Sequence, residues 1–222
     1  MHFLITAGGT REYIDPVRFI SNASSGRMGY ALARAAQKAG HRVTLISASD
    51  LQPPVGVEFV GVDSAAEMFK AVKNFFAKCD CLIMAAAVAD YTPVQTAKTK
   101  IKKEDKSLTI ELKPTTDILK WAGRHKKVRS QKTEGRRQKA GNGGQKGQIV
   151  VGFALEDKNL WANAEKKLKE KNLDMIVANT PASIGADKST VEIKIRERKW
   201  LKLPKASKAT IAQKIISLVG TT

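Results

Sequence analysis

Cysteine is scarce in this chain of 222 residues, which holds only Cys79 and Cys81, one residue apart. A zinc site would need more ligands than these two side chains supply, and a disulfide at that spacing would be strained. Neither a structural zinc site nor a disulfide framework is therefore expected. We interpret both cysteines as reduced thiols, as is usual for a cytoplasmic protein.

Long apolar runs are missing as well. No stretch approaches the roughly 20 residues that a membrane-spanning helix needs. Met1 is followed almost at once by an apolar strand pattern, which argues against a signal peptide. The length, with 42% hydrophobic and 27% charged residues, suits a soluble globular chain. We expect one domain over residues 1–222, in the cytoplasm and away from membranes.

Acidic residues are few beside the basic ones, 21 against 39, which leaves a net charge of +18. Acidic phosphorylated substrates account for some of this excess, and nucleic acid could account for more. Between Lys126 and Gln148 eight basic residues stand against Glu134 alone, among five glycines. We predict a solvated basic, Gly-rich insertion at about residues 126–148, with incidental RNA binding as the alternative. No aromatic residue interleaves there, so a stacking surface for single strands is not expected.

Two standard nucleotide motifs are also absent, the P-loop and a G-x-G-x-x-G placed directly between strand and helix. Asp50 is only a loose candidate for the acidic residue of a dinucleotide site. Instead, a long polar segment separates the strand predicted at residues 2–6 from a helix with apolar positions Met28, Ala31, Leu32 and Ala35. Such loops usually run about 2–6 residues. A loop this long predicts a functional role.

The chemistry of this segment favours an anion. Gly8 and Gly9 allow close approach of a ligand to the backbone. Ser24, Ser25 and Gly26 stand where the helix begins, and a helix N-terminus binds phosphate through its free N–H groups. Three arginines add positive charge nearby: Arg11, Arg18 and Arg27. The alternative is a Gly-rich turn with Ser24 or Ser25 as the helix N-cap and no ligand.

The remaining patterns alternate between strand and helix. Strands are expected at residues 42–47, 57–60, 81–86, 108–112, 149–153, 174–178 and 191–195. Helices are expected around Met68, Val72, Phe75 and Phe76, around Trp161, Ala164 and Leu168, and around Ile211, Ile215 and Leu218. This order predicts a three-layer α/β/α, Rossmann-like fold with a mostly parallel sheet. The alternating residues 108–112 predict a small mixed β region.

Two further stretches are candidates for binding. Small residues Ala85–Ala89 and then Asp90 stand at the end of the strand expected at 81–86, where open parallel sheets bind ligands. Asp90 could accept a bond from a hydroxyl, although close packing of a helix on the sheet would need the same small residues. A polar segment also carries Lys98, Lys100, Lys102 and Lys103. It is either a solvated basic loop or a loop that brings a lysine onto a triphosphate.

Taken together, these segments closely resemble the phosphopantothenate–cysteine ligase family, also called phosphopantothenoylcysteine synthetase. They occur in the family's order and cover nearly the whole chain. The resemblance is carried by residues 6–12, 14–22, 24–29, 85–91, 100–103, 117–119, 151–156 and 174–179. The basic insertion departs from the family, where a short connection would be expected.

The resemblance implies a ligase that joins 4′-phosphopantothenate to L-cysteine in coenzyme A biosynthesis. The reaction would pass through an acyl-nucleotide and convert CTP, or alternatively ATP, to the monophosphate and pyrophosphate. Mg²⁺ is expected on the triphosphate, with no residue assigned as its ligand. The resemblance also implies a homodimer, with residues 108–112 and 191–195 as candidate interface strands, and a separate or fused flavin-dependent decarboxylase. The alternatives are an NAD(P)-binding Rossmann oxidoreductase and a basic nucleic-acid-binding protein.

Residue roles carry over position by position. Asn22 and Lys100 are implied as the catalytic residues. The implied substrate-binding residues are Asn22, Ala86, Ala87 and Asp90. The implied nucleotide-binding residues are Gly8, Ser24, Ser25, Gly26, Ala86, Asp90, Lys100, Pro114, Thr115, Thr116, Asp117, Phe153, Lys167 and Lys171. Around Pro114 this chain reads Lys-Pro-Thr-Thr-Asp, where the family commonly has proline directly before the aspartate.

Overall fold

An eight-stranded sheet runs through the molecule in the order β12-β11-β10-β9-β6-β1-β4-β5. The structure, a computed structural model, describes residues 1–127, 147–183 and 185–221. Neighbours from β10 to β5 are parallel, whereas β11 and β12 join antiparallel. The strands are β1 (His2–Ala7), β4 (Arg42–Ser47), β5 (Glu58–Gly61), β6 (Cys81–Met84), β9 (Ile149–Leu155), β10 (Met175–Asn179), β11 (Lys188–Ile195) and β12 (Leu201–Ser207).

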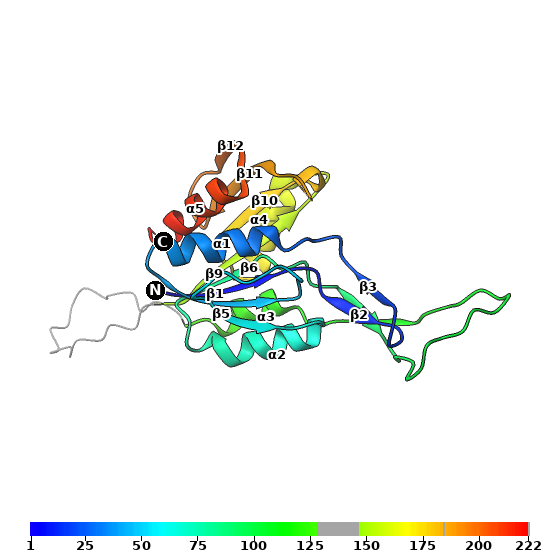
Figure 1. Ribbon diagram of the computed structural model, residues 1–222. Helices are drawn as coiled ribbons and strands as arrows, with labels where there is room; N and C mark the ends of the chain where they lie inside the picture. The colour runs from blue at the N-terminus through cyan, green and yellow to red at the C-terminus, as the bar shows by residue number, and fades with distance from the viewer. Residues whose placement is uncertain (128–146, 184, 222) are drawn as a thin grey trace.

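Helices cover both faces of this sheet (Figure 1). One apolar core joins the sheet to α1 (Arg27–Lys38) and α5 (Lys208–Val219). The core on the other face joins it to α2 (Ala65–Phe76), α3 (Ile118–His125) and α4 (Leu160–Glu170). The predicted three-layer α/β/α fold with a mostly parallel sheet is therefore confirmed. No helix in the described ranges is both long and apolar enough to cross a bilayer.

Two small sheets stand beside the main one. The long segment after β1 folds into a hairpin of β2 (Arg11–Tyr13) and β3 (Phe19–Ser21). The second small sheet pairs β7 (Tyr91–Pro93) with β8 (Leu112–Pro114). Between β7 and β8 lie residues 94–111, here called the arm, drawn in green and reaching beyond β2 and β3 in Figure 1.

One local prediction was wrong, and the alternative of a serine cap on α1 is not found among the described residues. The strand expected at 108–112 begins only at Leu112, because Leu108 lies exposed on the arm, where no described strand pairs with it. Neither Ser24 nor Ser25 caps α1. Gly26 is the N-cap, with a left-handed φ of 76°, and no described side chain caps this helix. The insertion predicted at about 126–148 lies mostly outside the described residues.

Candidate functional site

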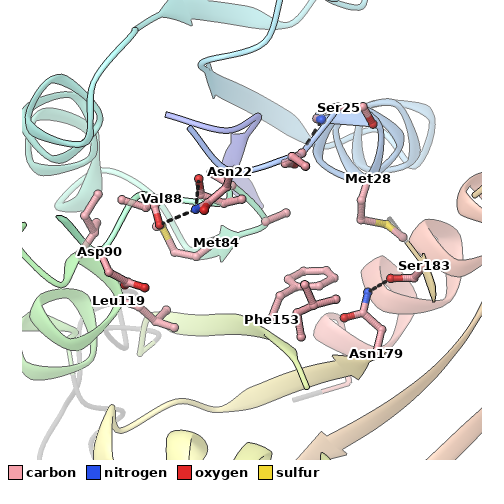
Figure 2. Close-up of a pocket in the computed structure, with 18 of the residues that line it drawn as sticks. Asn22, Ser25, Met28, Met84, Val88, Asp90, Leu119, Phe153, Asn179 and Ser183 are labelled. Carbon is pink, nitrogen blue, oxygen red and sulfur yellow. Dashed lines mark hydrogen bonds between the residues drawn. The ribbon is translucent and has the colours of Figure 1, made fainter. Parts of the chain in front are cut away.

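A pocket of about 530 Å³ opens at the carboxyl ends of the parallel strands. Its walls come from five groups of residues that are far apart in sequence: residues 22–28; residues 84–88 with Asp90; residues 115–119; Phe153, Leu155 and Glu156; and Asn179, Ser183, Gly185 and Ser189. Three lysines complete the lining: Lys167, Lys171 and Lys208. Figure 2 shows Asn22 and Val88 on one side, Phe153 in the middle, and Met28 and Ser183 toward the far end. This is the edge at which open α/β sheets bind ligands.

The start of α1 forms one wall of the pocket. A Cβ on Gly26 would lie 2.8 Å from Cβ of Ser49, so only glycine fits this left-handed position against β4. The Ser49 hydroxyl donates to the carbonyl oxygen of Ser25 at 3.1 Å and holds the approach to the helix. Ser24, Ser25 and Gly26 all line the pocket. The uncapped N-terminus of α1 therefore faces it, as anion binding requires.

Gly8 has a different position from the one expected for a ligand contact. It is not among the pocket-lining residues in the described part of the chain. A Cβ there would lie 2.7 Å from the backbone of both Ala48 and Ser49. Gly8 thus lies behind the pocket wall, where its left-handed φ of 85° lets the loop pass close to the end of β4.

Asn22 lines the pocket beside the loop that follows β6. Its Nδ2 donates to the carbonyl oxygens of Ala87 at 3.3 Å and Val88 at 3.2 Å, drawn as dashed lines in Figure 2. An isolated bridge between Gly9 and Ala87 also joins the segment after β1 to the segment after β6. The amide of Asn22 is therefore fixed beside the small residues after β6, where Ala86 and Ala87 leave room for a ligand.

The opposite wall is built on the start of α3. Thr115 donates through Oγ1 to the carbonyl of Ala89 at 2.6 Å, and its amide donates to that of Asp90 at 2.9 Å. Thr116 and Asp117 follow in the lining. Pro114 is not a lining residue in the described structure; it pairs with Tyr91 in the β7–β8 sheet.

Two lysines also line this side of the pocket: Lys167 from α4 and Lys171 from the C-cap of that helix. Nζ of Lys171 lies 2.8 Å from Oδ2 of Asp117. Burial raises the pKa of Asp117, but the hydrogen bonds from Lys171 and from the Lys120 amide outweigh it, so that this pKa lies below its usual value. Nζ of Lys167 donates to the Phe153 carbonyl at 2.7 Å.

Lys167 is a half-buried cation. Burial lowers its pKa, and the positive charge of Lys171 lowers it further. A partly desolvated ammonium group beside a second cation has lost solvation that an anion could replace. The pair therefore favours a ligand that brings negative charge into the pocket.

Lys100 is not brought to the pocket of its own chain. It is exposed on the arm and is absent from the lining residues that the structure describes. Of the residues singled out from the sequence, the pocket gathers Asn22, Ser24, Ser25, Gly26, Ala86, Ala87, Asp90, Thr115, Thr116, Asp117, Phe153, Lys167 and Lys171. Gly8, Pro114 and Lys100 lie outside it.

Sequence reasoning missed the far end of the pocket. Nζ of Lys208 donates to the carbonyls of Ser183 at 3.4 Å and Ala186 at 2.5 Å. Asn179 donates to the Ser183 hydroxyl at 2.8 Å, as Figure 2 shows. Nothing in the local pattern distinguishes Lys208 from other lysines, because its direction depends on how α5 packs. The one available signal is its place directly after the N-cap Ser207.

Comparison with known proteins gives the family. The model of the DFP family, the DNA/pantothenate metabolism flavoprotein C-terminal domain, matches residues 1–221. The chain belongs to this family. It is 44% identical over 225 residues to the "Coenzyme A biosynthesis bifunctional protein CoaBC" of Bacillus subtilis (strain 168), covering 99% of this chain and 51% of that protein. The family assignment agrees with the resemblance found in the motifs.

Two further comparisons support the same family. A protein of the same name from Vibrio vulnificus (strain CMCP6) is 40% identical over 224 residues, which is 98% of this chain and 51% of that protein. The chain thus spans about half the length of the curated relatives it matches. The crystal structure of the C-terminal domain of a CoaBC protein has a TM-score of 0.78 at 36% identity, covering 99% of this chain and 94% of that one.

Proposed function

We propose that this chain catalyses the ligation of 4′-phosphopantothenate to L-cysteine, driven by a nucleoside triphosphate, in coenzyme A biosynthesis. The observation that carries the proposal is the pocket itself, where the α1 N-terminus, the amide of Asn22 and the Lys167–Lys171 pair converge. The names of the family relatives, which refer to coenzyme A biosynthesis, support it.

The reaction needs two steps. A carboxylate oxygen of phosphopantothenate attacks the α-phosphorus of the nucleotide, the bond to the β-phosphate oxygen breaks, and pyrophosphate leaves. The cysteine amine then attacks the acyl carbon, loses a proton, and expels the nucleoside monophosphate. Both nucleophiles come from the substrates, so the protein acts mainly by positioning and by stabilising charge.

The pocket residues divide naturally between these steps. The α1 N-terminus and the two α4 lysines would hold the phosphates, because both present positive charge. Asn22, a neutral donor, would face the acyl carbonyl as negative charge grows on its oxygen. Both hydrogens of its Nδ2 are donated to backbone carbonyls, which fixes the position of the amide, so Asn22 would exchange one of these two bonds for the acyl oxygen.

Mg²⁺ fits a site of this kind when the substrate supplies most of its ligands. Among the described residues no group of three or more His, Cys, Asp or Glu side chains could hold a metal ion. Mg²⁺ commonly binds through one or two carboxylates together with phosphate oxygens and water. Asp90, exposed at the pocket rim, would supply such a carboxylate. The ion would neutralise charge on the triphosphate.

The decisive experiment is pyrophosphate release with phosphopantothenate, cysteine and each nucleoside triphosphate in turn. We propose that CTP is preferred, on the resemblance of the motifs to bacterial family members. Equal or faster turnover with ATP would contradict the preference, and no release with any nucleotide would contradict the ligase function. A flavin-dependent decarboxylase, separate or fused, would consume the product, and we place both reactions in the cytoplasm.

We also propose a homodimer, whose interface keeps residues 108–112 of the two expected segments but not residues 191–195. β11 cannot extend a sheet into a second copy, because β10 and β12 already pair with both of its edges. Exposed apolar side chains gather instead on the two small sheets and the arm: Val17, Phe19, Ile20, Tyr91, Val94, Leu108 and Leu112. Sedimentation that shows only a 24.2 kDa species at micromolar concentration would contradict a dimer.

The two alternatives receive less support. Asp50, the loose candidate for a dinucleotide acid, lies 2.5 Å from Nη2 of Arg11 and is not a residue of the main pocket. A thermal shift with NAD(P) but not with CTP would revive the oxidoreductase. Salt-dependent affinity for generic DNA that is lost on deleting residues 126–148, while ligase activity persists, would identify nucleic-acid binding as incidental.

A further inference from the structure

The turn of the β2–β3 hairpin contains a buried carboxylate. Asp15 is 0% exposed although it stands at the tip of a short hairpin. Its Oδ1 accepts the amides of Val17 and Arg18, each at 2.8 Å, and these bonds shape the turn. A buried carboxylate needs donors to replace water, and these local bonds satisfy only one of its two oxygens.

The other oxygen reaches the arm. Oδ2 of Asp15 accepts from Nε of Arg18 at 2.9 Å, from its Nη2 at 2.5 Å, and from the backbone amide of Ile101 at 3.1 Å. Nη2 of Arg18 also donates to the carbonyl of Ile101. Both backbone groups of Ile101 are therefore bound to the hairpin. Ile101 directly follows Lys100 in the chain.

Earlier residues of the arm are bound to the same hairpin. The amide of Ala97 donates to the carbonyl of Ile14 at 3.0 Å, and Oγ1 of Thr96 donates to that of Tyr13 at 3.0 Å. The first part of the arm thus runs along the hairpin turn, and the bonds to Ile101 are the last of this series. The bonds of Asp15 and Arg18 to Ile101 are here called the clamp. Burial raises the pKa of Asp15, but its five donors outweigh burial and hold that pKa well below the usual range, so the clamp is charged at neutral pH.

We propose that Asp15 is a positioning residue, which acts with Arg18 on both backbone groups of Ile101 and so sets where the arm presents Lys100. This inference rests on the proposed role of Lys100 in the ligase reaction. Asp15 itself touches neither the pocket nor the reacting atoms. Its effect on turnover passes through Lys100 alone.

Asp15→Asn separates the two duties of this side chain. The amide oxygen of Asn can still accept the turn bonds of Val17 and Arg18. Its NH2 group, however, would face the guanidinium of Arg18 and the amide of Ile101, where donor meets donor. Asp105→Asn is the matched control, because it removes the same charge from an exposed position on the same arm.

The first measurement does not depend on activity. Trypsin cleaves after lysine, and Lys100, Lys102 and Lys103 directly flank or follow Ile101. We expect Asp15→Asn to speed cleavage within the arm by about tenfold or more, the scale of losing a charge-assisted hydrogen bond. Cleavage elsewhere and the rates of Asp105→Asn should stay at the wild-type values. Unchanged cleavage in the arm would overturn the clamp.

The second measurement is a double-mutant cycle on pyrophosphate release. We expect Asp15→Asn to lower kcat by about 10- to 100-fold and to leave the nucleotide KM within about threefold, as for a displaced catalytic group. Asp15→Asn combined with Lys100→Gln should be no slower than Lys100→Gln alone. Additive losses would show that Asp15 acts by another route. Full activity of Lys100→Gln would instead contradict the proposed role of Lys100, while the cleavage result would still decide on the clamp.

Discussion

Nζ of Lys171, at the C-cap of α4, lies 2.8 Å from Oδ2 of Asp117, the residue that caps the N-terminus of α3. The pair joins two helices across one wall of the pocket. Asp117 therefore has two tasks, since Oδ1 accepts the amide of Lys120 at 2.9 Å while Oδ2 faces the lysine. A phosphate that binds Lys171 must compete with this carboxylate.

The Asp117–Lys171 pair predicts a loss of stability in acid. The pKa of Asp117 is lowered in the folded chain, so its contribution is present above the unfolded value near pH 4 and is lost as the pH falls through the folded value. Asn caps helices as well as Asp does. We expect Asp117→Asn to be less stable than wild type at pH 7, by less than about 1 kcal/mol for a partly solvated pair. Urea unfolding should show this difference shrinking toward pH 3.

The lowered pKa of Lys167 predicts how binding depends on pH. Wild-type affinity for the nucleotide should fall as the pH rises, because Lys167 loses its charge at a lower pH than an exposed lysine. In Lys167→Arg the side chain stays charged throughout the pH range in which a lysine loses its proton. We expect the rise in KM to move to higher pH in this variant. Superimposable KM profiles of the two proteins would contradict a phosphate contact by Lys167.

Gly123 predicts a packing defect that reaches the pocket. A Cβ there would lie 1.8 Å from the carbonyl oxygen of Lys171, and Nδ2 of Asn172 donates to the Gly123 carbonyl at 2.8 Å. Gly123→Ala should therefore destabilise the fold by about 1–3 kcal/mol and weaken nucleotide binding through Lys171. Gly220→Ala is the control, since its Cβ would come no nearer than 3.4 Å to Ser217. Urea unfolding compares the two.

Asn22→Asp tests the second chemical step. The variant should still form acyl-nucleotide and pyrophosphate but transfer poorly to cysteine, because a carboxylate repels the charge developing on the acyl oxygen. It would also face the carbonyls of Ala87 and Val88 without donors, so nucleotide binding must be measured alongside. Rapid-quench analysis separates the steps. Loss of pyrophosphate release with normal binding would place Asn22 in the first step.

Lys100→Gln tests the arm. Loss of one electrostatic contact at a reacting centre usually costs about 10²–10³ in turnover. We expect a decrease of that size in pyrophosphate release, with the described fold unchanged because Lys100 is exposed. Lys98→Gln, another lysine of the arm, should retain near wild-type rates. Equal losses in both variants would indicate a general charge effect.

Much of the fold could be predicted because buried strands and amphipathic helices have clear periods. Cys81–Met84 and Met175–Asn179 are buried parallel strands, as their apolar runs indicated. The alternation around Leu108 predicted a strand that is not there, because alternation does not show whether a neighbouring strand is present to pair with it. The N-cap at Gly26 depends on a contact with Ser49, which no local pattern contains.

The pocket was less predictable than the fold. The lining around Asn22 and Asp117 followed from motifs, because short motifs place their side chains locally. Lys208 was missed, since only tertiary packing turns it toward Ser183. Gly8 shows the converse: a glycine in a binding motif serves here to let two backbones pass, a distinction that only the fold reveals.

The hydrogen bonds between Lys127 and Gln148 have a practical consequence. The amide of each residue is bound by the other, so the two ends of the intervening chain are held together just before β9 begins. That point is at the amino edge of the sheet, whereas the pocket is at the carboxyl edge. Lengthening a connection whose ends already meet costs little free energy. A reporter domain or an immobilisation tag grafted between these two residues would leave the pocket facing free solution.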